Sequence, residues 1–153
     1  MNKRIIGSVE DFLNLTGELL GESNWMCVSQ EVINHFADAT FDHQWIHVNP
    51  KRAKKESPYQ TTIAHGYLTI SLIPHFLDEI FEVVNLKQLV NYSVDKMVFR
   101  SAVPVNSRLR MKAMLKSAKD LGNICKASIQ CVFEVEGNDE PVLEGNIVFL
   151  YYF

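Results

Sequence analysis

Asp42 and His47 are the first pair of side chains in the sequence that could move protons on a bound substrate. Four residues separate them within residues 41–50, a stretch that fits neither a helical nor a strand period. An imidazole titrates near neutral pH, and burial can bring a carboxyl group into the same range. The pair could therefore hold one water molecule and exchange its protons. Alternatively, the two side chains form a hydrogen bond that only shapes the loop.

A second segment, Ile63-Ala-His-Gly66, lies where the longest apolar helix of the sequence is expected to begin. The first N–H groups of a helix have no partner within it and carry partial positive charge. Gly66 has no side chain to cover its N–H, so a carbonyl oxygen could approach it and be polarised. A second interpretation stays open, because a glycine here could serve only a tight turn into the helix.

Length and composition indicate one globular domain, which we place at residues 1–153. The chain has 47% hydrophobic and 22% charged residues, close to the average of globular proteins. Fifteen Lys and Arg against eighteen Asp and Glu give a net charge of −3. Such a chain has no overall positive field to attract nucleic acid, so we expect no nucleic-acid partner.

We expect neither a disulfide framework nor a metal centre. The three cysteines show no CxxC spacing, and Cys125 and Cys131 fall on the apolar face of an expected strand, where a thiol is usually inert. His43 and His47 are four positions apart, but Pro50 and the missing helical period do not favour a helical HxxxH pair, and no third ligand is evident.

The compartment is inferred from segments that the sequence lacks. A signal peptide needs an apolar stretch of about 7–15 residues near the N-terminus, and the first residues have none. No run of about 18 apolar residues is present for a membrane span. We therefore expect a cytoplasmic protein without a membrane partner.

Helices are expected in the first half of the chain, where they would position the two segments. Ser8 and Ser29 are typical N-cap residues, and apolar positions follow each of them at helical spacing. A brief strand is expected at residues 25–28 and a short basic helical turn at residues 51–55. The longest apolar helix is expected at about residues 66–84, with a kink or local break at Pro74.

Strands are expected in the second half, where apolar and polar residues alternate. The expected strands lie at about residues 88–100, 108–116, 125–136 and 142–152. The fold class is therefore α+β, with one antiparallel sheet wrapped around a single long helix, which is the hot-dog arrangement. The edge strand of such a sheet commonly pairs with a second copy, so we expect a homodimer.

Taken together, the two segments resemble one enzyme family. Residues 36–50 read Phe-Ala-Asp-Ala-Thr-Phe-Asp-His-Gln-Trp-Ile-His-Val-Asn-Pro, Ala53 follows, and residues 64–72 read Ala-His-Gly-Tyr-Leu-Thr-Ile-Ser-Leu. This pattern resembles the MaoC-like (R)-specific enoyl-CoA hydratases and dehydratases over about residues 25–115. The resemblance implies a hot-dog dimer in which the acyl chain lies in a tunnel beside the central helix.

The resemblance also implies a reaction and a set of site residues. Asp42 and His47 match the catalytic acid–base pair, and Gly66 matches the glycine whose N–H binds the oxyanion. The implied enzyme is a hydro-lyase that reversibly adds water to trans-2-enoyl thioesters to give (3R)-hydroxyacyl thioesters. Its substrate would be carried by coenzyme A (CoA) or acyl carrier protein, and no cofactor is implied.

Three further residues are expected to bind substrate because they accompany this pattern. They are His65, Phe41 and Asn49. Phe41 stands where the family usually has glycine, and Asn49 stands where aspartate is common.

Two alternative functions remain open at the level of sequence. A hot-dog thioesterase would need a carboxylate on or near the central helix, where Asp78 and Glu79 are available but late in the helix. A non-catalytic acyl-thioester binding module is favoured by Phe41, whose bulk could fill the pocket.

Overall fold

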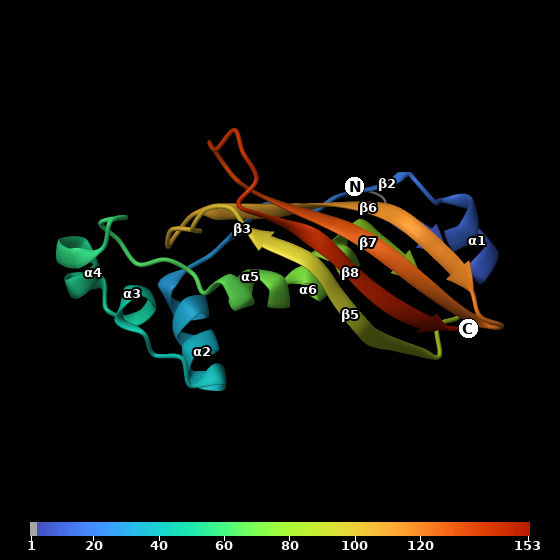
Figure 1. Cartoon of the computed structure of the whole chain (residues 1–153), viewed down its shortest axis with the longest axis horizontal. Helices are drawn as coiled ribbons and strands as arrows, with labels where there is room; N and C mark the ends of the chain where they lie inside the picture. The colour runs from blue at the N-terminus through green and yellow to red at the C-terminus, as the bar shows by residue number, and fades with distance from the viewer. Residues whose placement is uncertain (1–2) are drawn as a thin grey trace.

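A six-stranded antiparallel sheet forms the main layer of the protein in the computed structural model, which describes residues 3–153 (Figure 1). The first two residues of the expected domain lie outside the described residues. The strand order is β2-β6-β7-β8-β5, and β3 also pairs with β6. The strands of this sheet are β2 (Leu19–Glu22), β3 (Met26–Cys27), β5 (Gln88–Phe99), β6 (Arg108–Asp120), β7 (Ile124–Val135) and β8 (Leu143–Tyr152).

The long strands arise from the alternation that the sequence shows. In β7 the side chains alternate strictly between buried and intermediate, because one face covers the core. The strand expected near residues 25–28 and the four later strands are confirmed. The short strand β2 was not expected, since its sequence Leu-Leu-Gly-Glu has no alternation, and pairing with β6 is what makes it a strand.

The central helix is where the fold departs most from the expected elements. It consists of α5 (Gly66–Ser71) and α6 (Ile73–Ile80), which break at Leu72. Pro74 lies in the first turn of α6, where its missing N–H costs little, so the break expected near Pro74 is confirmed.

The expectation that this helix continues to residue 84 is wrong. The chain leaves α6 at Ile80 and forms β4 (Phe81–Val83) instead. This strand pairs in parallel with β1 (Arg4–Ile6), a partner far away in the sequence. The apolar residues that suggested further helical turns therefore pack as a strand, with Phe81 against Phe12 at a ring-centroid distance of 6.4 Å.

The remaining helices begin at caps that can be recognised in the sequence. The side chain of Ser8 accepts a hydrogen bond from the Asp11 N–H at the start of α1 (Val9–Asn14). Ser29 caps α2 (Gln30–Thr40) in the same way through the Val32 N–H. Both N-cap assignments are confirmed.

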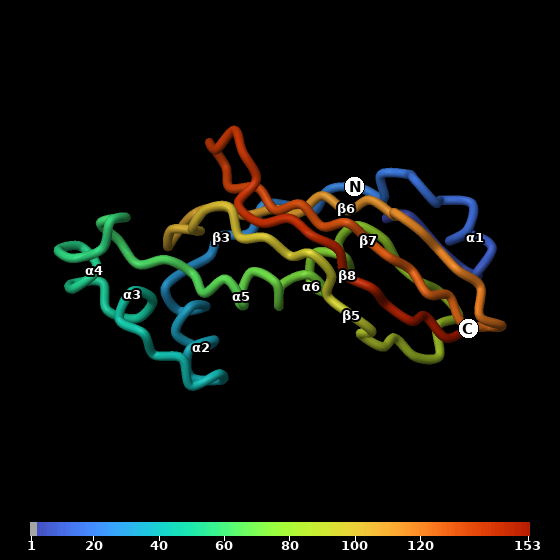
Figure 2. The backbone as a smooth tube through the Cα atoms, viewed as in Figure 1, coloured from blue at the N-terminus to red at the C-terminus, as the bar shows by residue number. Residues whose placement is uncertain are grey.

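Helices α2, α3 (Trp45–Val48) and α4 (Pro50–Glu56) gather at one end of the molecule, and α1 lies at the other (Figure 1). From α4 the chain returns to α5 through residues 57–65 (Figure 2). Backbone hydrogen bonds tie this segment to the loop after β5, from the Ala64 N–H to the Val103 carbonyl (2.8 Å) and from the Val105 N–H to the Thr62 carbonyl (2.9 Å). The start of α5 is thereby held against the sheet.

Membrane-spanning character is not found in these elements. None of the helices within residues 3–153 combines the length and the apolar character that crossing a bilayer requires.

Gly145 provides a test of how closely β8 packs against the irregular part of β5. A Cβ atom at this position would lie 2.6 Å from the Met97 Cα and 3.0 Å from the Lys96 carbonyl oxygen. The register of β5 shifts between Asp95 and Val98, and backbone atoms cannot move there without disturbing the pairing. We expect Gly145→Ala to lower the free energy of unfolding by about 1–3 kcal/mol in urea titrations.

Gly7→Ala is the matched control for this substitution. An added Cβ at Gly7 would meet only side-chain atoms at 3.4 Å or more. Its stability should stay within about 0.5 kcal/mol of the parent protein. Equal stabilities of the two variants would show that β5 can move away from the added methyl group at little cost in free energy.

Candidate active site

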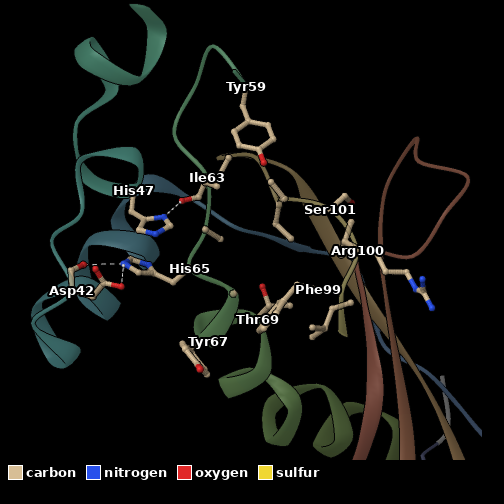
Figure 3. Close-up of a pocket in the computed structure, with 16 residues that line it drawn as sticks. Asp42, His47, Tyr59, Ile63, His65, Tyr67, Thr69, Phe99, Arg100 and Ser101 are labelled. Atoms are coloured by element: carbon tan, nitrogen blue, oxygen red, sulfur yellow. Dashed lines mark hydrogen bonds and ion pairs between the residues drawn. The ribbon is translucent and has the colours of Figure 1, made fainter. Parts of the chain in front are cut away.

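A cavity of about 480 Å³ lies where residues 57–65, α5 and the end of β5 meet (Figure 3). Asp42, His47, His65 and Gly66 all line it. The structure therefore brings the two segments singled out in the sequence to one cavity. Its remaining walls are largely apolar and come from the loop after β5 and the start of β8.

His47 is held rigidly by its backbone and by one ring nitrogen. It lies in α3 and is 8% exposed. Its Nδ1 is 2.7 Å from the Ile63 carbonyl oxygen, which can only accept a hydrogen bond, so Nδ1 carries the proton. In the neutral ring, Nε2 is then the unprotonated nitrogen that can accept a proton.

The environment of His47 favours its neutral form. Burial lowers the pKa of His47 below its ordinary value of 6.5, and the neighbouring His65 also lowers this pKa. The hydrogen bond to Ile63 and the charge of Asp42 act in the opposite direction without reversing the shift. His47 is therefore mostly neutral at neutral pH.

Asp42 lies directly after α2 and is more exposed than His47. Its side chain accepts a hydrogen bond from the Gln44 N–H (3.4 Å). Its backbone carbonyl accepts a second one from Nε2 of His65 (2.9 Å), and its carboxylate oxygen Oδ2 lies 4.0 Å from the same nitrogen. The carboxylate thus stands at the cavity with most of its hydrogen-bonding capacity free.

His65 connects the two acid–base residues. It is 2% exposed, its ring stacks on that of His47 with centroids 3.8 Å apart, and its ring centroid lies 5.1 Å from that of Phe36. Because Nε2 donates to Asp42, Nδ1 carries a lone pair, and within residues 3–153 this buried nitrogen has no hydrogen-bond partner. These contacts suit a residue that positions Asp42 and His47.

Gly66 opens α5 and has the ring of Phe99 beside it. A Cβ atom at this position would lie 2.5 Å from Cε1 and 2.9 Å from Cδ1 of that ring. A side chain at this position would therefore displace the ring of Phe99 as well as cover the N–H. Among the hydrogen bonds of residues 3–153, none uses the Gly66 N–H, which leaves this donor available.

The structure does not bring two of the expected substrate-binding residues to the cavity. Phe41 ends α2 in the left-handed conformation (φ 61°), is 87% exposed and is not among the residues that line the cavity. Glycine is the residue that most often adopts the left-handed conformation at a helix C-terminus. This preference explains why glycine is common at this position in the family that the sequence resembles. Asn49 instead caps α4, since its side chain accepts a hydrogen bond from the Arg52 N–H (3.0 Å).

Several residues of the site could not be recognised from the sequence. Phe99 and Tyr59 line the cavity, and Gln30 supports it from α2. The side chain of Gln30 donates to the His47 carbonyl (2.7 Å) and accepts from the Thr62 hydroxyl (2.6 Å). No sequence signal could have identified this role of Gln30, because His47 and Thr62 lie 17 and 32 positions away from it.

The arrangement suits proton transfer better than metal binding. Asp42, His47 and His65 each offer one atom within 4.8 Å of the others. However, each imidazole already donates one nitrogen to a backbone carbonyl, and the two rings are stacked with an angle of 28° between their planes. In-plane lone pairs of stacked rings do not converge on one ion as the tetrahedral geometry of zinc requires.

The cysteines take no part in this site. Burial raises the pKa of the Cys125 thiol to about 11 and that of Cys131 to about 12. Both thiols are therefore protonated at neutral pH, in agreement with the expectation of inert cysteines on the apolar face of β7.

The lowered pKa of His47 predicts a pH dependence of stability. Above about pH 6.5 the ring is neutral in both the folded and the unfolded chain, so the full stability is present. As the pH falls from 6.5 through the lower pKa of the folded state, the unfolded chain binds more protons and stability is lost. We expect the free energy of unfolding to decrease over this range more steeply than in His47→Gln.

Urea titrations between about pH 7.5 and pH 5 would measure this difference. All other ionisable groups are shared by the two proteins, so the difference between their curves isolates His47. Parallel curves for the two proteins would contradict the assignment of a lowered pKa.

The sequence of this chain is similar to known proteins over most of its length. Residues 11–133 match the family described as MaoC like domain. The chain is 41% identical over 149 residues to 3-hydroxyacyl-thioester dehydratase Z of Mycobacterium tuberculosis, which covers 97% of this chain and 98% of that protein. It is also 36% identical over 148 residues to nodulation protein N of Rhizobium leguminosarum bv. viciae, covering 95% of this chain and 92% of that protein.

Solved structures support the fold. A structure described as monoamine oxidase regulatory protein, from an Archaeoglobus species, superimposes with a TM-score of 0.78 and 18% identity. The match covers 100% of this chain and 99% of the other. At this level of identity the likeness concerns the fold alone.

Proposed function

Because this chain belongs to the MaoC-like domain family and is an enzyme of the hydratase and dehydratase type, we propose that it adds water reversibly to trans-2-enoyl thioesters. The products would be (3R)-hydroxyacyl thioesters. The observation that carries the proposal is the meeting of Asp42, His47 and Gly66 at one cavity. The relative that is 41% identical, a 3-hydroxyacyl-thioester dehydratase by name, supports a thioester substrate.

In the hydration direction, Asp42 and His47 hold the attacking water. The water oxygen bonds to the β-carbon of the substrate, while its proton passes to the pair, most directly to the free Nε2 of His47. A proton from the pair is delivered to the α-carbon, so that the pair returns to its starting state. The reaction needs no cofactor, since water and these side chains supply every atom that is transferred.

During this addition the thioester carbonyl oxygen gains negative charge. The Gly66 N–H, which no other group of residues 3–153 uses, would donate a hydrogen bond to that oxygen. The apolar part of the cavity wall, which includes Ile63, Val103 and Leu143, would contact the acyl chain. The thioester would be carried by CoA or by acyl carrier protein.

A homodimer is part of this proposal. Strand β5 forms one edge of the sheet, so its outer backbone groups have no strand partner within residues 3–153. Exposed apolar side chains follow this edge at Leu89, Tyr92, Val94, Val98 and Phe99. Pairing with the same strand of a second copy would satisfy the backbone and cover these side chains.

The geometry gives the two alternative functions less support. Neither Asp78 nor Glu79 lines the cavity, and they are engaged elsewhere, Asp78 with Lys3 (3.5 Å) and Glu79 with the Asn24 N–H (2.8 Å). The two carboxylates of α6 that a thioesterase could have used therefore do not reach the cavity. Phe41 lies outside the cavity, which removes the observation that favoured a non-catalytic binding module.

A hydration assay with (2E)-enoyl-CoA substrates from four to sixteen carbons tests the proposal. Loss of the enoyl absorbance should be seen for at least one chain length, and chiral chromatography of the hydrolysed product should give the (3R)-hydroxy acid. Release of free thiol instead of hydration would support a thioesterase. No hydration of any enoyl thioester, whether carried by CoA or by acyl carrier protein, would overturn the proposal.

A further inference from the structure

Thr69 is a buried residue at the cavity whose hydroxyl the proposed function does not yet use. It lies on α5, three residues after Gly66, and is 3% exposed. It lines the cavity, and Figure 3 shows it near Phe99. The Cα–Cβ bonds of a helix tilt toward its N-terminus, so the side chain of Thr69 leans toward the Gly66 end of α5.

The hydroxyl of Thr69 has no hydrogen-bond partner among residues 3–153. Hydroxyl groups in helices commonly donate to the carbonyl one turn earlier. Ser71 on the same helix does this toward the Tyr67 carbonyl, and Thr40 on α2 does it toward the Phe36 carbonyl, each at 2.7 Å. Thr69 makes no such bond, although it is more deeply buried than either of them.

The hydroxyl oxygen is not among the fully enclosed polar atoms that lack a partner, so it is open to the cavity, and a molecule that fills the cavity can supply its partner. The groups around it narrow the choice of partner. Ala64, Phe99 and Val103 contribute apolar lining to the same cavity, and the Gly66 N–H is a free donor on the same helix as Thr69. A ligand oxygen placed here can accept from both the N–H and the hydroxyl, because a carbonyl oxygen has two lone pairs.

We propose that the Thr69 hydroxyl donates a hydrogen bond to the thioester carbonyl oxygen of the substrate, as a second donor beside the Gly66 N–H. This inference rests on the proposed hydratase function. The negative charge on that oxygen grows during the addition of water, so the hydrogen bond strengthens toward the transition state. Thr69 therefore acts mainly on kcat and has a smaller effect on KM.

The test compares variants that differ only in the hydroxyl group. Thr69→Val keeps the shape of the side chain and should lower kcat by about 10²-fold, with KM changed by less than about threefold. Thr69→Ser keeps the hydroxyl and should remain within about tenfold of the parent enzyme. Ser71→Ala, which removes an exposed hydroxyl from the same helix, should leave kcat unchanged.

A spectroscopic measurement separates hydrogen bonding from packing. In the slow Asp42→Asn background, bound crotonyl-CoA should show a lower carbonyl stretching frequency with Thr69 present than after Thr69→Val. A purely structural role for Thr69 would leave this frequency unchanged. Should Thr69→Val fail to fold, the pair Thr69→Ser and Thr69→Ala gives the same comparison, since these two differ by a single hydroxyl.

The outcomes distinguish the two levels of the inference. If the parent enzyme hydrates an enoyl thioester but Thr69→Val retains its kcat and the same carbonyl frequency, the role of Thr69 is overturned and the hydratase assignment stands. If the parent enzyme hydrates no enoyl thioester at all, the proposed function and the role of Thr69 fall together.

Discussion

His47→Ala is expected to lower kcat for enoyl-thioester hydration by about 10²–10⁴-fold. The substitution removes the ring whose neutral Nε2 accepts the proton of water, and the second buried imidazole at the cavity, His65, is held by its hydrogen bond to the Asp42 carbonyl. Asp42→Asn keeps the size of the side chain but removes its charge, so it should lower kcat by a similar factor. Steady-state kinetics with the best enoyl-CoA substrate would measure both losses.

His43→Ala is the matched control for these variants. His43 lies next to Asp42 in the sequence, but it is exposed, pairs with Asp38 (2.8 Å) and does not line the cavity. Its removal should leave kcat within about twofold of the parent value. If His43→Ala lost as much activity as His47→Ala, the proton transfer could not be assigned to the buried imidazole.

The Asp42→Asn and His47→Ala double variant sharpens this prediction. Residues that act on one water molecule as a unit are strongly non-additive, so the double variant should be about as slow as the slower single variant. Losses that multiply would indicate two groups acting in separate steps.

Gly66→Ala is expected to lower kcat/KM by about 10²-fold. The new methyl group would stand 2.5 Å from Cε1 of Phe99, so the ring of Phe99 has to move. Because that ring is half exposed, the protein should still fold, while the displaced ring and the methyl group restrict access to the Gly66 N–H. Kinetics and circular dichroism together would separate lost access from lost structure.

Phe99→Ala, alone and combined with Gly66→Ala, identifies which of the two groups causes the loss. If the clash with Phe99 is responsible, the double variant should regain the activity of Phe99→Ala. If the methyl group itself blocks the thioester oxygen, the double variant should stay as slow as Gly66→Ala. Full activity of Gly66→Ala would mean that the oxyanion does not bind at this N–H.

The support around the site explains why small changes there should have large effects. His65 is stacked on His47 and donates to Asp42, and Gln30 holds the His47 carbonyl from α2. Four segments of the chain are thereby fixed to one another before substrate binds. A site of this kind does not have to reorganise as charge develops, which is the main source of electrostatic catalysis.

Local sequence was sufficient for the elements whose signals are local. The alternation along β6 and β7 reflects one face on the core, and Ser8 and Ser29 cap helices through N–H groups only three residues away. The break near Pro74 follows from the geometry of the proline ring. The types and spacing of Asp42 and His47 were also enough to identify them as a candidate pair.

Tertiary structure decided where these residues point and what they meet. Residues 45–48 are helical without a helical period, and residues 81–83 form a strand because β1 lies beside them. Phe41 and Asn49 accompany the site in the sequence, yet one faces solvent and the other caps a helix. Sequence period shows which face of an element is apolar, but it carries no information about which distant segment covers that face.

The surroundings of Gly66 illustrate this difference. That the residue is glycine, at the start of an apolar helix, can be read from the chain itself. That the ring of Phe99 lies against it, and that the Thr69 hydroxyl is left without a partner beside it, depends on how β5 and α5 pack together. Contacts between segments far apart in the chain arise from packing and loop closure, so only the folded structure determines them.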